Sequence, residues 1–228
     1  MVAPLPPNED VRLEWLRRYR ILDTATERVF DELTHLAATI CEAPVSLLSL
    51  VDTDRQWFKS TYGFDEKELP REDAFCAHAI LGAEIMVVED AKADPRFVRN
   101  PLVTGRPHIR FYAGAPITVG PDLHLGSLCV IDSKPRRLDE RQLEALSIIR
   151  RSVVAHMELR RSQKDLESVA ALLPMCAWCR RIKVSEGPKP DWEPLHRYVE
   201  RAVTVTHGIC PDCSAQKFTG APSDPSQG

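Results

Sequence analysis

Apolar residues in the first forty positions recur at the spacing of an α-helix. After the Pro-rich residues 1–7, Asn8 can cap a first helix, whose apolar positions are Val11, Leu13, Leu16 and Tyr19. A second helix follows Asp23 and Thr24, with apolar positions at Val29, Leu33, Leu36 and Ile40. This second stripe is predicted to be the buried face of its helix.

The pattern then changes to short β-branched and alternating runs, which are typical of strands. Residues 44–52 and 56–63 predict a hairpin, with a turn between them. Acidic residues open a predicted helix over 71–82, and residues 94–108 hold too many prolines and turn formers for more than a loop with one helical turn. The remaining predicted strands are 84–90, 109–117 and 124–132.

A long helix is predicted over residues 138–173. Its apolar stripe is interrupted by the polar residues 160–164 and consists of Leu143, Leu146, Ile149, Val153, Met157, Leu166, Val169 and Leu173. A sustained stripe that projects from a domain favours burial against a second copy, as in a parallel coiled coil. The alternative is a helix that folds back onto its own domain.

Length and charge exclude several classes of protein. The chain has 228 residues and a net charge of −3, and it lacks the basic excess of a dedicated nucleic-acid-binding protein. The first residues lack the features of a secretory signal, and no apolar run approaches the roughly 20 residues that span a bilayer. We therefore expect a cytoplasmic protein without membrane contact, in which the seven cysteines are reduced.

Two cysteine pairs give the sharpest chemical signal in the chain. Cys176 and Cys179 form one Cys-x2-Cys pair, and Cys210 and Cys213 form the other. Two such turns can surround one ion with four thiolates, which predicts a closed structural Zn²⁺ site in residues 174–213. His207 is a possible substitute ligand, and an iron–sulfur cluster would use the same thiolates. A redox dithiol lacks the βαβ context that this interpretation needs.

Five residues in the central region are candidates for ligand binding: Cys76, His78, Arg110, Tyr112 and Cys129. Alternation along a strand places Arg110 and Tyr112 on one face, where they would suit an anionic or aromatic ligand. They would equally suit a surface where Arg110 pairs with an acid. Cys76 falls near the start of a predicted helix, and Cys129 lies between apolar residues of a strand, where it would be part of the core.

Several segments resemble GAF domains that precede bacterial histidine kinases and diguanylate cyclases. They are SLLSLVDTDRQWFKS at 46–60, REDAFCAHAI at 71–80, the run 94–117, and LGSLCVIDSKPR at 125–136. The resemblance extends over about residues 8–160. It implies an α+β fold with a central antiparallel sheet, helices on one side and a small-molecule pocket on the other. It also implies a homodimer through the terminal helices and a role in two-component signalling.

The domain organisation follows from the resemblance and the cysteine pattern. We expect a lead-in with a helix at 1–24, a GAF core at 25–137, a signalling helix at 138–173, the metal-binding unit at 174–213, and a disordered Ser/Pro/Gly-rich tail at 214–228.

Three functions fit this organisation. The first is a non-catalytic sensor that passes a ligand or redox signal through the long helix to a signalling partner. The second is a thiol enzyme similar to the free methionine-(R)-sulfoxide reductases, in which Cys76 would match one thiol. Residues 91–111 contain no cysteine that could serve as its partner there. The third is a zinc-dependent adaptor or DNA-interacting regulator.

Overall fold

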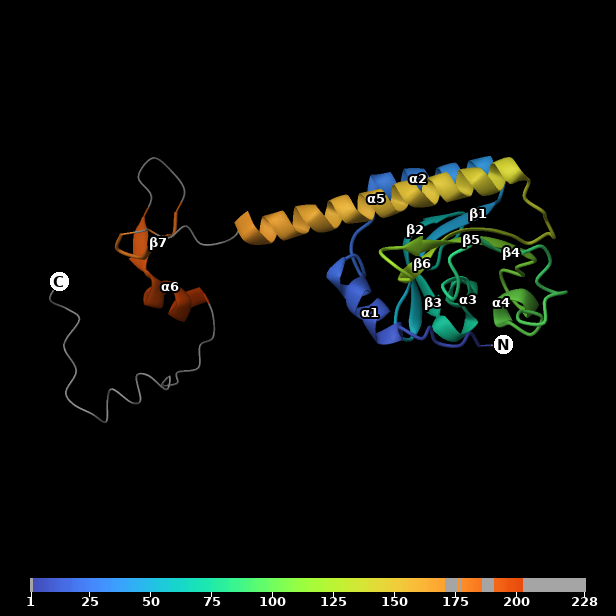
Figure 1. Ribbon diagram of the computed structural model, residues 1–228, viewed down its shortest axis with the longest axis horizontal. Helices are drawn as coiled ribbons and strands as arrows, with labels where there is room; N and C mark the ends of the chain where they lie inside the picture. The colour runs from blue at the N-terminus through green and yellow to red at the C-terminus, as the bar shows by residue number, and fades with distance from the viewer. Residues whose placement is uncertain (1, 171–175, 177, 186–190, 203–228) are drawn as a thin grey trace, which may run out of the picture. The chain divides into compact units, whose positions relative to one another are not determined.

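The computed structural model describes residues 2–170, 176, 178–185 and 191–202. The chain divides into two compact units, Met1–Glu167 and Ser168–Gly228, which are treated separately below. Figure 1 shows the first unit as a sheet with helices on both of its faces.

The first unit is built on one six-stranded sheet in which every neighbouring pair is antiparallel. The strand order is β3-β2-β1-β6-β5-β4. The strands are β1 (Val45–Val51), β2 (Arg55–Tyr62), β3 (Glu68–Pro70), β4 (Met86–Val88), β5 (Phe111–Thr118) and β6 (His124–Asp132). The prediction of an α+β fold with a central antiparallel sheet is confirmed.

Long helices cover one face of this sheet, and short ones cover the other (Figure 1). The helical face carries α1 (Glu9–Arg18), α2 (Arg28–Ile40) and α5 (Glu140–Ala170), and the opposite face carries η1 (Arg71–Asp73), α3 (Phe75–Ala79) and α4 (Pro101–Thr104). Asp139 and Gln142 start α5 with a reciprocal capping box, because each side chain accepts a hydrogen bond from the other's backbone N–H.

The apolar stripe predicted for the second helix is confirmed at Val29 and Leu33, which pack against the core, and is wrong at Leu36 and Ile40. α2 buries Phe30, Thr34, Ala37 and Ala38 against the sheet, whereas Leu36 is 44% exposed and Ile40 is 38% exposed. The two alanines let the helix backbone come close to the strands, and Phe30 fills the space at its start. The larger apolar residues Leu36 and Ile40 are left facing outward.

The stripe on α5 packs against its own domain as far as Met157. Leu146, Ile149, Val153 and Met157 belong to the same core as Leu128 and Val130 of β6. For this part of the helix the coiled-coil prediction is wrong, and the fold-back alternative holds, because the helical face of the sheet supplies the apolar partner. Farther along, Leu159 is 54% exposed and Leu166 is 68% exposed. Leu173 and the side chain of Val169 lie outside the described residues.

Several element boundaries differ from the prediction. The helix expected over 71–82 is divided at Ala74, whose extended backbone separates η1 from α3. β3 was not predicted, since three residues carry too little periodicity to be recognised. Asn8 occupies the N-cap position of α1 but makes no capping bond, and its side-chain amide donates to the Asp122 carbonyl instead.

The second unit holds a small hairpin followed by a helix. β7 (Arg181–Lys183) pairs antiparallel with β8 (Trp192–Pro194), and α6 (Leu195–Ala202) follows directly. Cys210, Cys213, His207 and the tail at 214–228 lie outside the described residues. Within the part of the chain that the structure describes, no helix has the length and apolar character needed to cross a membrane.

Candidate functional site

The face of the sheet that carries η1, α3 and α4 is called the pocket face below. A cluster of thiols and hydroxyls lies on this face, over the central strands. Alternation along β5 turns Tyr112 toward α3 and Phe111 toward the long helices. On β6, Cys129 faces the same side as Tyr112, while Leu128 and Val130 face the long helices. These side chains meet under the short helix α3, where Cys76 is 1% exposed.

The sulfur atoms of Cys76 and Cys129 are 3.9 Å apart, and both side chains are buried. The Tyr112 hydroxyl donates a hydrogen bond to the Cys76 sulfur at 3.3 Å. Its oxygen also lies 3.2 Å from the hydroxyl oxygen of Ser127. Residues from α3, β5 and β6 therefore form one connected polar cluster inside an apolar core.

The polar cluster gives the thiols of Cys76 and Cys129 different pKa values. Burial would raise the pKa of Cys76, but hydrogen bonding, with the largest contributions from Cys129, Ser127 and Tyr112, lowers it to about 7. The contact with Cys76 and burial raise the pKa of Cys129 well above its ordinary value. Cys76 is thus the more acidic thiol of the pair, and Cys129 stays protonated near neutral pH.

A small cavity of about 20 Å³ reaches the cluster from the side of α4, and Cys76 and Tyr112 are part of its lining. It has room for about one water-sized molecule. An outer pocket of about 200 Å³ shares four wall residues with it: Phe64, Pro107, Ile109 and Ile131. The outer pocket therefore gives the inner cavity a path toward the surface.

Gln56 contributes an unpaired polar group to the inner cavity. This β2 side chain is 3% exposed and lines the cavity, and its amide oxygen has no hydrogen-bond partner. The hydroxyl of Ser49, a neighbour of Ser127 across β1 and β6, is also buried without a hydrogen-bond partner. Leaving such a group unpaired costs roughly 1–3 kcal/mol, so the cavity presents an acceptor to any donor that enters.

Sequence reasoning did not find Gln56, Ser49 or Ser127. All three lie on the face of the sheet that turns toward the pocket, Ser49 and Ser127 in strands that are otherwise largely apolar and Gln56 in the mixed strand β2. A polar residue at such a position was the available signal, because burial of a polar side chain requires a reason.

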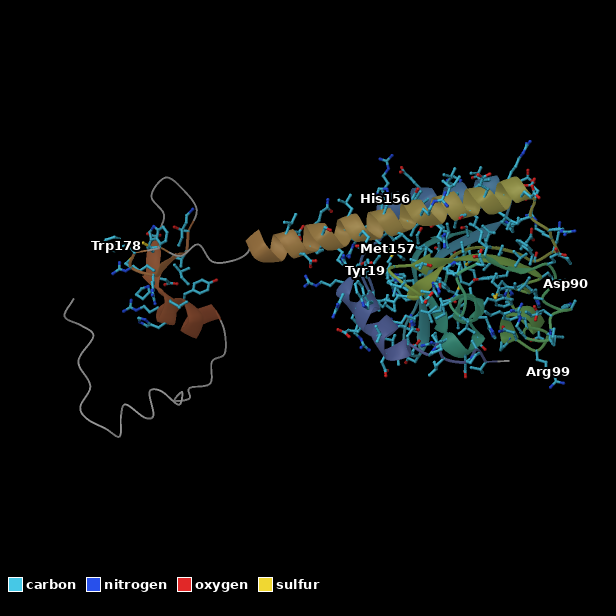
Figure 2. The ribbon with its side chains drawn as sticks, viewed as in Figure 1. Tyr19, Asp90, Arg99, His156, Met157 and Trp178 are labelled. Carbon is cyan, nitrogen blue, oxygen red and sulfur yellow. The ribbon has the colours of Figure 1, made fainter. Side chains whose placement is uncertain are left out.

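Two of the five predicted ligand-binding residues lie apart from this cluster. Arg110 precedes β5 and binds Asp90 through two hydrogen bonds of 2.7 Å, which is the surface pairing left open as an alternative. Figure 2 labels Asp90 near the edge of the unit. The ring of His78 lies edge-on to Phe97 at 4.8 Å between centroids. Neither His78 nor Arg110 lines the inner cavity.

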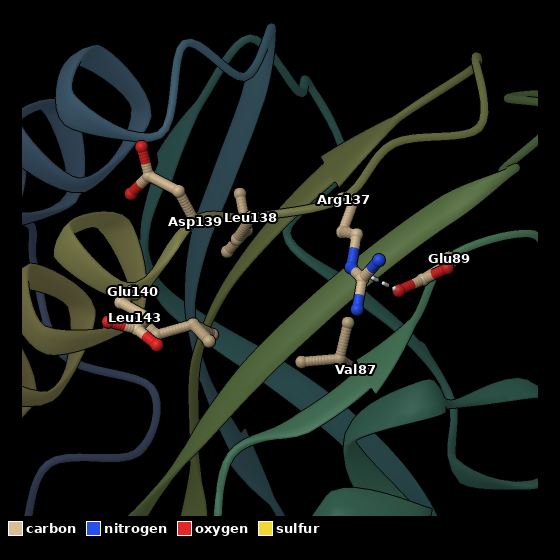
Figure 3. Close-up of a pocket in the computed structure, with 7 residues that line it drawn as sticks. All are labelled: Val87, Glu89, Arg137, Leu138, Asp139, Glu140 and Leu143. Atoms are coloured by element: carbon tan, nitrogen blue, oxygen red, sulfur yellow. Dashed lines mark ion pairs between the residues drawn. The ribbon is translucent and has the colours of Figure 1, made fainter.

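An open surface groove of about 580 Å³ lies at the start of α5 (Figure 3). Val87, Leu138 and Leu143 provide its apolar part, and an ion pair of 3.3 Å between Arg137 and Glu89 crosses one end. It shares no lining residue with the thiol cavity, so it is a separate feature of the surface.

In the second unit, the backbone around Cys176 is arranged as a tight turn. The Arg180 N–H donates to the Cys176 carbonyl at 2.9 Å, and the Cys176 N–H donates to the Arg181 carbonyl at 2.8 Å. Backbone N–H groups of Cys179 and Trp178 bond the Cys176 sulfur and lower its pKa. These contacts favour a thiolate, which is the form that binds metal.

The turn leaves its aromatic neighbours uncovered. Trp178 is 96% exposed and Trp192 is 40% exposed. Within those residues, Cys176 and Cys179 are not joined by a third histidine, cysteine or carboxylate to make a metal site.

Comparison with known proteins identifies the class of the first unit. Residues 25–156 match the GAF domain, and the chain belongs to this family. A cyclic di-GMP phosphodiesterase of Pseudomonas aeruginosa is 41% identical over 170 residues, which are 74% of this chain and 29% of that protein. The chain thus corresponds to less than a third of that relative, and its GAF domain is homologous to one in a signalling protein.

Solved structures agree with the fold. A domain of a protein described as a two-component sensor histidine kinase from Sinorhizobium meliloti has a TM-score of 0.50, at 13% identity over 64% of this chain and 99% of that chain. The chromophore-binding domain of a bacteriophytochrome from R. palustris has a TM-score of 0.51, at 12% identity over 70% of this chain and 65% of that chain. At these identities the likeness shows the GAF fold alone.

Proposed function

We propose that this protein is a non-catalytic sensor in which the cavity beside Cys76 receives a small ligand or a redox signal. The observation that carries the proposal is the buried amide oxygen of Gln56, which lines this cavity without a partner. A ligand with one N–H or O–H donor would satisfy it and would offset its desolvation cost. The apolar walls of the adjoining outer pocket of about 200 Å³ favour an otherwise nonpolar molecule, whose donor group would reach into the inner cavity.

Signal transmission to α5 is supported by the contacts that hold this helix. Glu27 accepts hydrogen bonds from buried Lys59 of β2 at 2.7 Å and from Arg160 of α5 at 2.8 Å. The Tyr19 hydroxyl donates to Glu158 of α5, and Figure 2 shows Tyr19 beside Met157, where α5 passes α1. A displacement of β2 at Gln56 would therefore reach α5 through Lys59 and Glu27.

A homodimer through the helical face is the second part of the proposal. Gln142 at the start of α5 bonds the Ile40 carbonyl at the end of α2, and Arg160 bonds Glu27 just before α2. The two helices thus run side by side in opposite directions. Their outward residues include exposed Leu36, Ile40, Ile148 and Leu159, which a second copy would cover.

A partner in second-messenger signalling is favoured by the P. aeruginosa relative, which is named as a cyclic di-GMP phosphodiesterase. We propose that the second unit contacts such a partner protein rather than DNA. Its four cysteines would hold a structural Zn²⁺, and the hydrogen-bonded turn at Cys176 supplies two of the ligands in thiolate-favouring surroundings. Bound zinc would supply folding free energy to a unit too small for a core of its own.

A thiol reductase remains the enzymatic alternative, and the contact between Cys76 and Cys129 favours it. These two thiols provide the nucleophile and the resolving partner that such an enzyme needs. Methionine sulfoxide reduction by the protein and by Cys76→Ser distinguishes the two functions. If the protein reduces methionine sulfoxide and Cys76→Ser does not, the protein is an enzyme and the proposal of a non-catalytic sensor is wrong.

Native mass spectrometry of the purified full chain tests the sensor. We expect a dimer that retains a small molecule, and loss of that molecule in Gln56→Leu. Gln163→Leu, on the exposed side of α5, is the matched control and should keep it. Equal retention by both variants would show that the ligand lies elsewhere, and the absence of any retained molecule or redox response would refute the sensory role.

A further inference from the structure

Cys76 and Cys129 are 53 residues apart in sequence, yet their sulfur atoms are in contact inside the GAF domain. Cys41, the other cysteine of the GAF domain, ends α2 on the helical face of the sheet. The pair is therefore a distinct feature of the pocket face.

The geometry allows the two sulfur atoms to be joined by a small displacement. A disulfide needs about 2.05 Å between sulfur atoms, so the gap of 3.9 Å must close by about 1.9 Å. Cys129 is fixed, because β6 pairs with Leu47 of β1 on one side and with Gly114 of β5 on the other. Cys76 lies on the five-residue helix α3, which is outside the sheet and would have to shift for the bond to form.

The two thiols also differ in pKa, as disulfide formation through a nucleophile and a resolving thiol requires. Hydrogen bonds from Tyr112 and Cys129 favour the thiolate of Cys76, which makes it the nucleophile. Cys129 stays protonated, since its pKa is raised, and it can act as the resolving thiol. The cavity of about 20 Å³ beside Cys76 has room for one small oxidant such as hydrogen peroxide.

We propose that Cys76 and Cys129 are a peroxide-sensitive redox pair that closes reversibly into a disulfide inside the GAF domain. The Cys76 thiolate attacks one oxygen of hydrogen peroxide, the O–O bond breaks, and Cys76 sulfenic acid and hydroxide form. The Cys129 sulfur then attacks the sulfenic sulfur, the S–O bond breaks, and the Cys129 proton leaves with the oxygen as water. In total, two thiols lose two electrons, and one peroxide becomes two water molecules.

Closing the disulfide would reshape the cavity. Phe75, the neighbour of Cys76 on α3, stacks on Phe97 with ring centroids 3.9 Å apart. Its ring also packs at a tilt against the Tyr112 ring, with 5.2 Å between centroids. A shift of α3 would disturb both contacts, and Tyr112 would lose its thiolate acceptor. The regulatory meaning of the disulfide rests on the proposed sensory function, whereas its formation does not.

Peptide mapping of the full chain tests the proposal. After treatment with hydrogen peroxide, we expect one peptide pair linked through Cys76 and Cys129, lighter by about two mass units and restored by a dithiol reductant. Cys129→Ser should stop at a sulfenic acid on Cys76 that dimedone traps, while Cys76→Ser should form neither product. Cys41→Ser is the control and should behave like the wild type.

Two results would overturn the redox pair. One is full alkylation of both thiols after peroxide treatment, and the other is equal dimedone labelling of Cys76 in the wild type and in Cys129→Ser. Failure of the sensory function would look different, because the disulfide would then form with no change in the molecule retained or in the subunit count.

Discussion

The hydroxyl of Tyr112 occupies the space that a side chain at Gly114 would need. A Cβ added to Gly114 would lie 2.1 Å from the Tyr112 hydroxyl oxygen and 2.6 Å from the ring carbon that carries it. The two residues are adjacent on the same face of β5, and Gly114 pairs with Cys129. The missing side chain at Gly114 is therefore what lets the tyrosine fold along the strand to reach Cys76.

Gly114→Ala should destabilise the GAF domain, since Tyr112 must move out of a filled core to admit the methyl group. We expect the free energy of unfolding to fall by about 1–3 kcal/mol, measured by urea denaturation. Gly82→Ala is the control, because a Cβ there meets nothing within 4 Å, and it should change the stability by less than about 0.5 kcal/mol. Equal effects of the two substitutions would contradict the packing of Tyr112 over Gly114.

Tyr112→Phe should make Cys76 less reactive near neutral pH. The pKa of Cys76 is about 7 while Tyr112 donates to its sulfur, so alkylation by iodoacetamide should rise as the pH passes through 7. Loss of the Tyr112 hydroxyl should raise the pKa of Cys76, so the increase in alkylation rate should occur at higher pH. The facing groups Cys129 and Tyr112 have raised pKa values and stay neutral in this range.

Cys41 is the internal control for the alkylation measurement. Burial raises its pKa to about 11, so Cys41 should stay unmodified up to about pH 9 in both proteins. An unchanged alkylation profile of Cys76 in Tyr112→Phe would show that the phenol does not set its acidity.

Glu9→Gln should lower the free energy of unfolding on the order of 3 kcal/mol at pH 7. Burial would raise the pKa of Glu9, but hydrogen bonds from Arg12 and Arg71 lower it to about 2. A depressed carboxyl pKa stabilises the fold above its unfolded value of 4.5, and this contribution is lost as the pH falls toward 2. The substitution also leaves fully buried Arg12 without its partner.

The stability of Glu9→Gln should therefore converge with that of the wild type between about pH 5 and pH 2, measured by thermal unfolding. Glu14→Gln removes a pair in which both side chains are more than half exposed, and it should cost less than about 1 kcal/mol at any pH. A gap between Glu9→Gln and the wild type that does not narrow in acid would contradict the assigned pKa.

Metal analysis of protein purified under reducing conditions tests the second unit. We expect about one Zn²⁺ per chain, lost in Cys176→Ser and in Cys210→Ser and retained in Cys41→Ser. Removal of the metal by a chelator should unfold β7, β8 and α6 and leave the GAF domain folded. Iron with visible absorbance in place of zinc would identify a cluster, and protein without metal would refute the site.

Leu159→Glu should convert the proposed dimer into monomers. Leu159 is 54% exposed on α5, so a charge there should not disturb the fold but would be costly in an apolar interface. Sedimentation of the full chain measures the change, and Gln163→Glu adds the same charge to an exposed polar position of the same helix. A variant that sediments like the wild type would place the interface elsewhere.

The spacing of apolar residues predicted most of the helices and strands of the GAF domain, because an element with one buried face carries apolar residues at regular intervals. β6 covers His124–Asp132 as predicted, and Phe111 and Tyr112 lie on opposite faces of β5, as the alternation of a strand requires. The same reasoning failed for the later part of α2, where Ala37 and Ala38 face the sheet and Leu36 does not. Hydrophobicity alone does not reveal where a helix must come close enough to need small residues.

Local spacing in the sequence located the long helix and the two cysteine pairs, and the resemblance of several segments to GAF domains implied the fold class. The tertiary structure decided which distant residues meet. In the folded chain, Cys76 contacts Cys129, and Gln56 lines the cavity beside Cys76 with its amide oxygen unpaired. Arg110 binds Asp90 at the surface. These relations depend on strand order and on the position of α3 over the sheet, and no local pattern along the chain encodes distances across β1, β5 and β6.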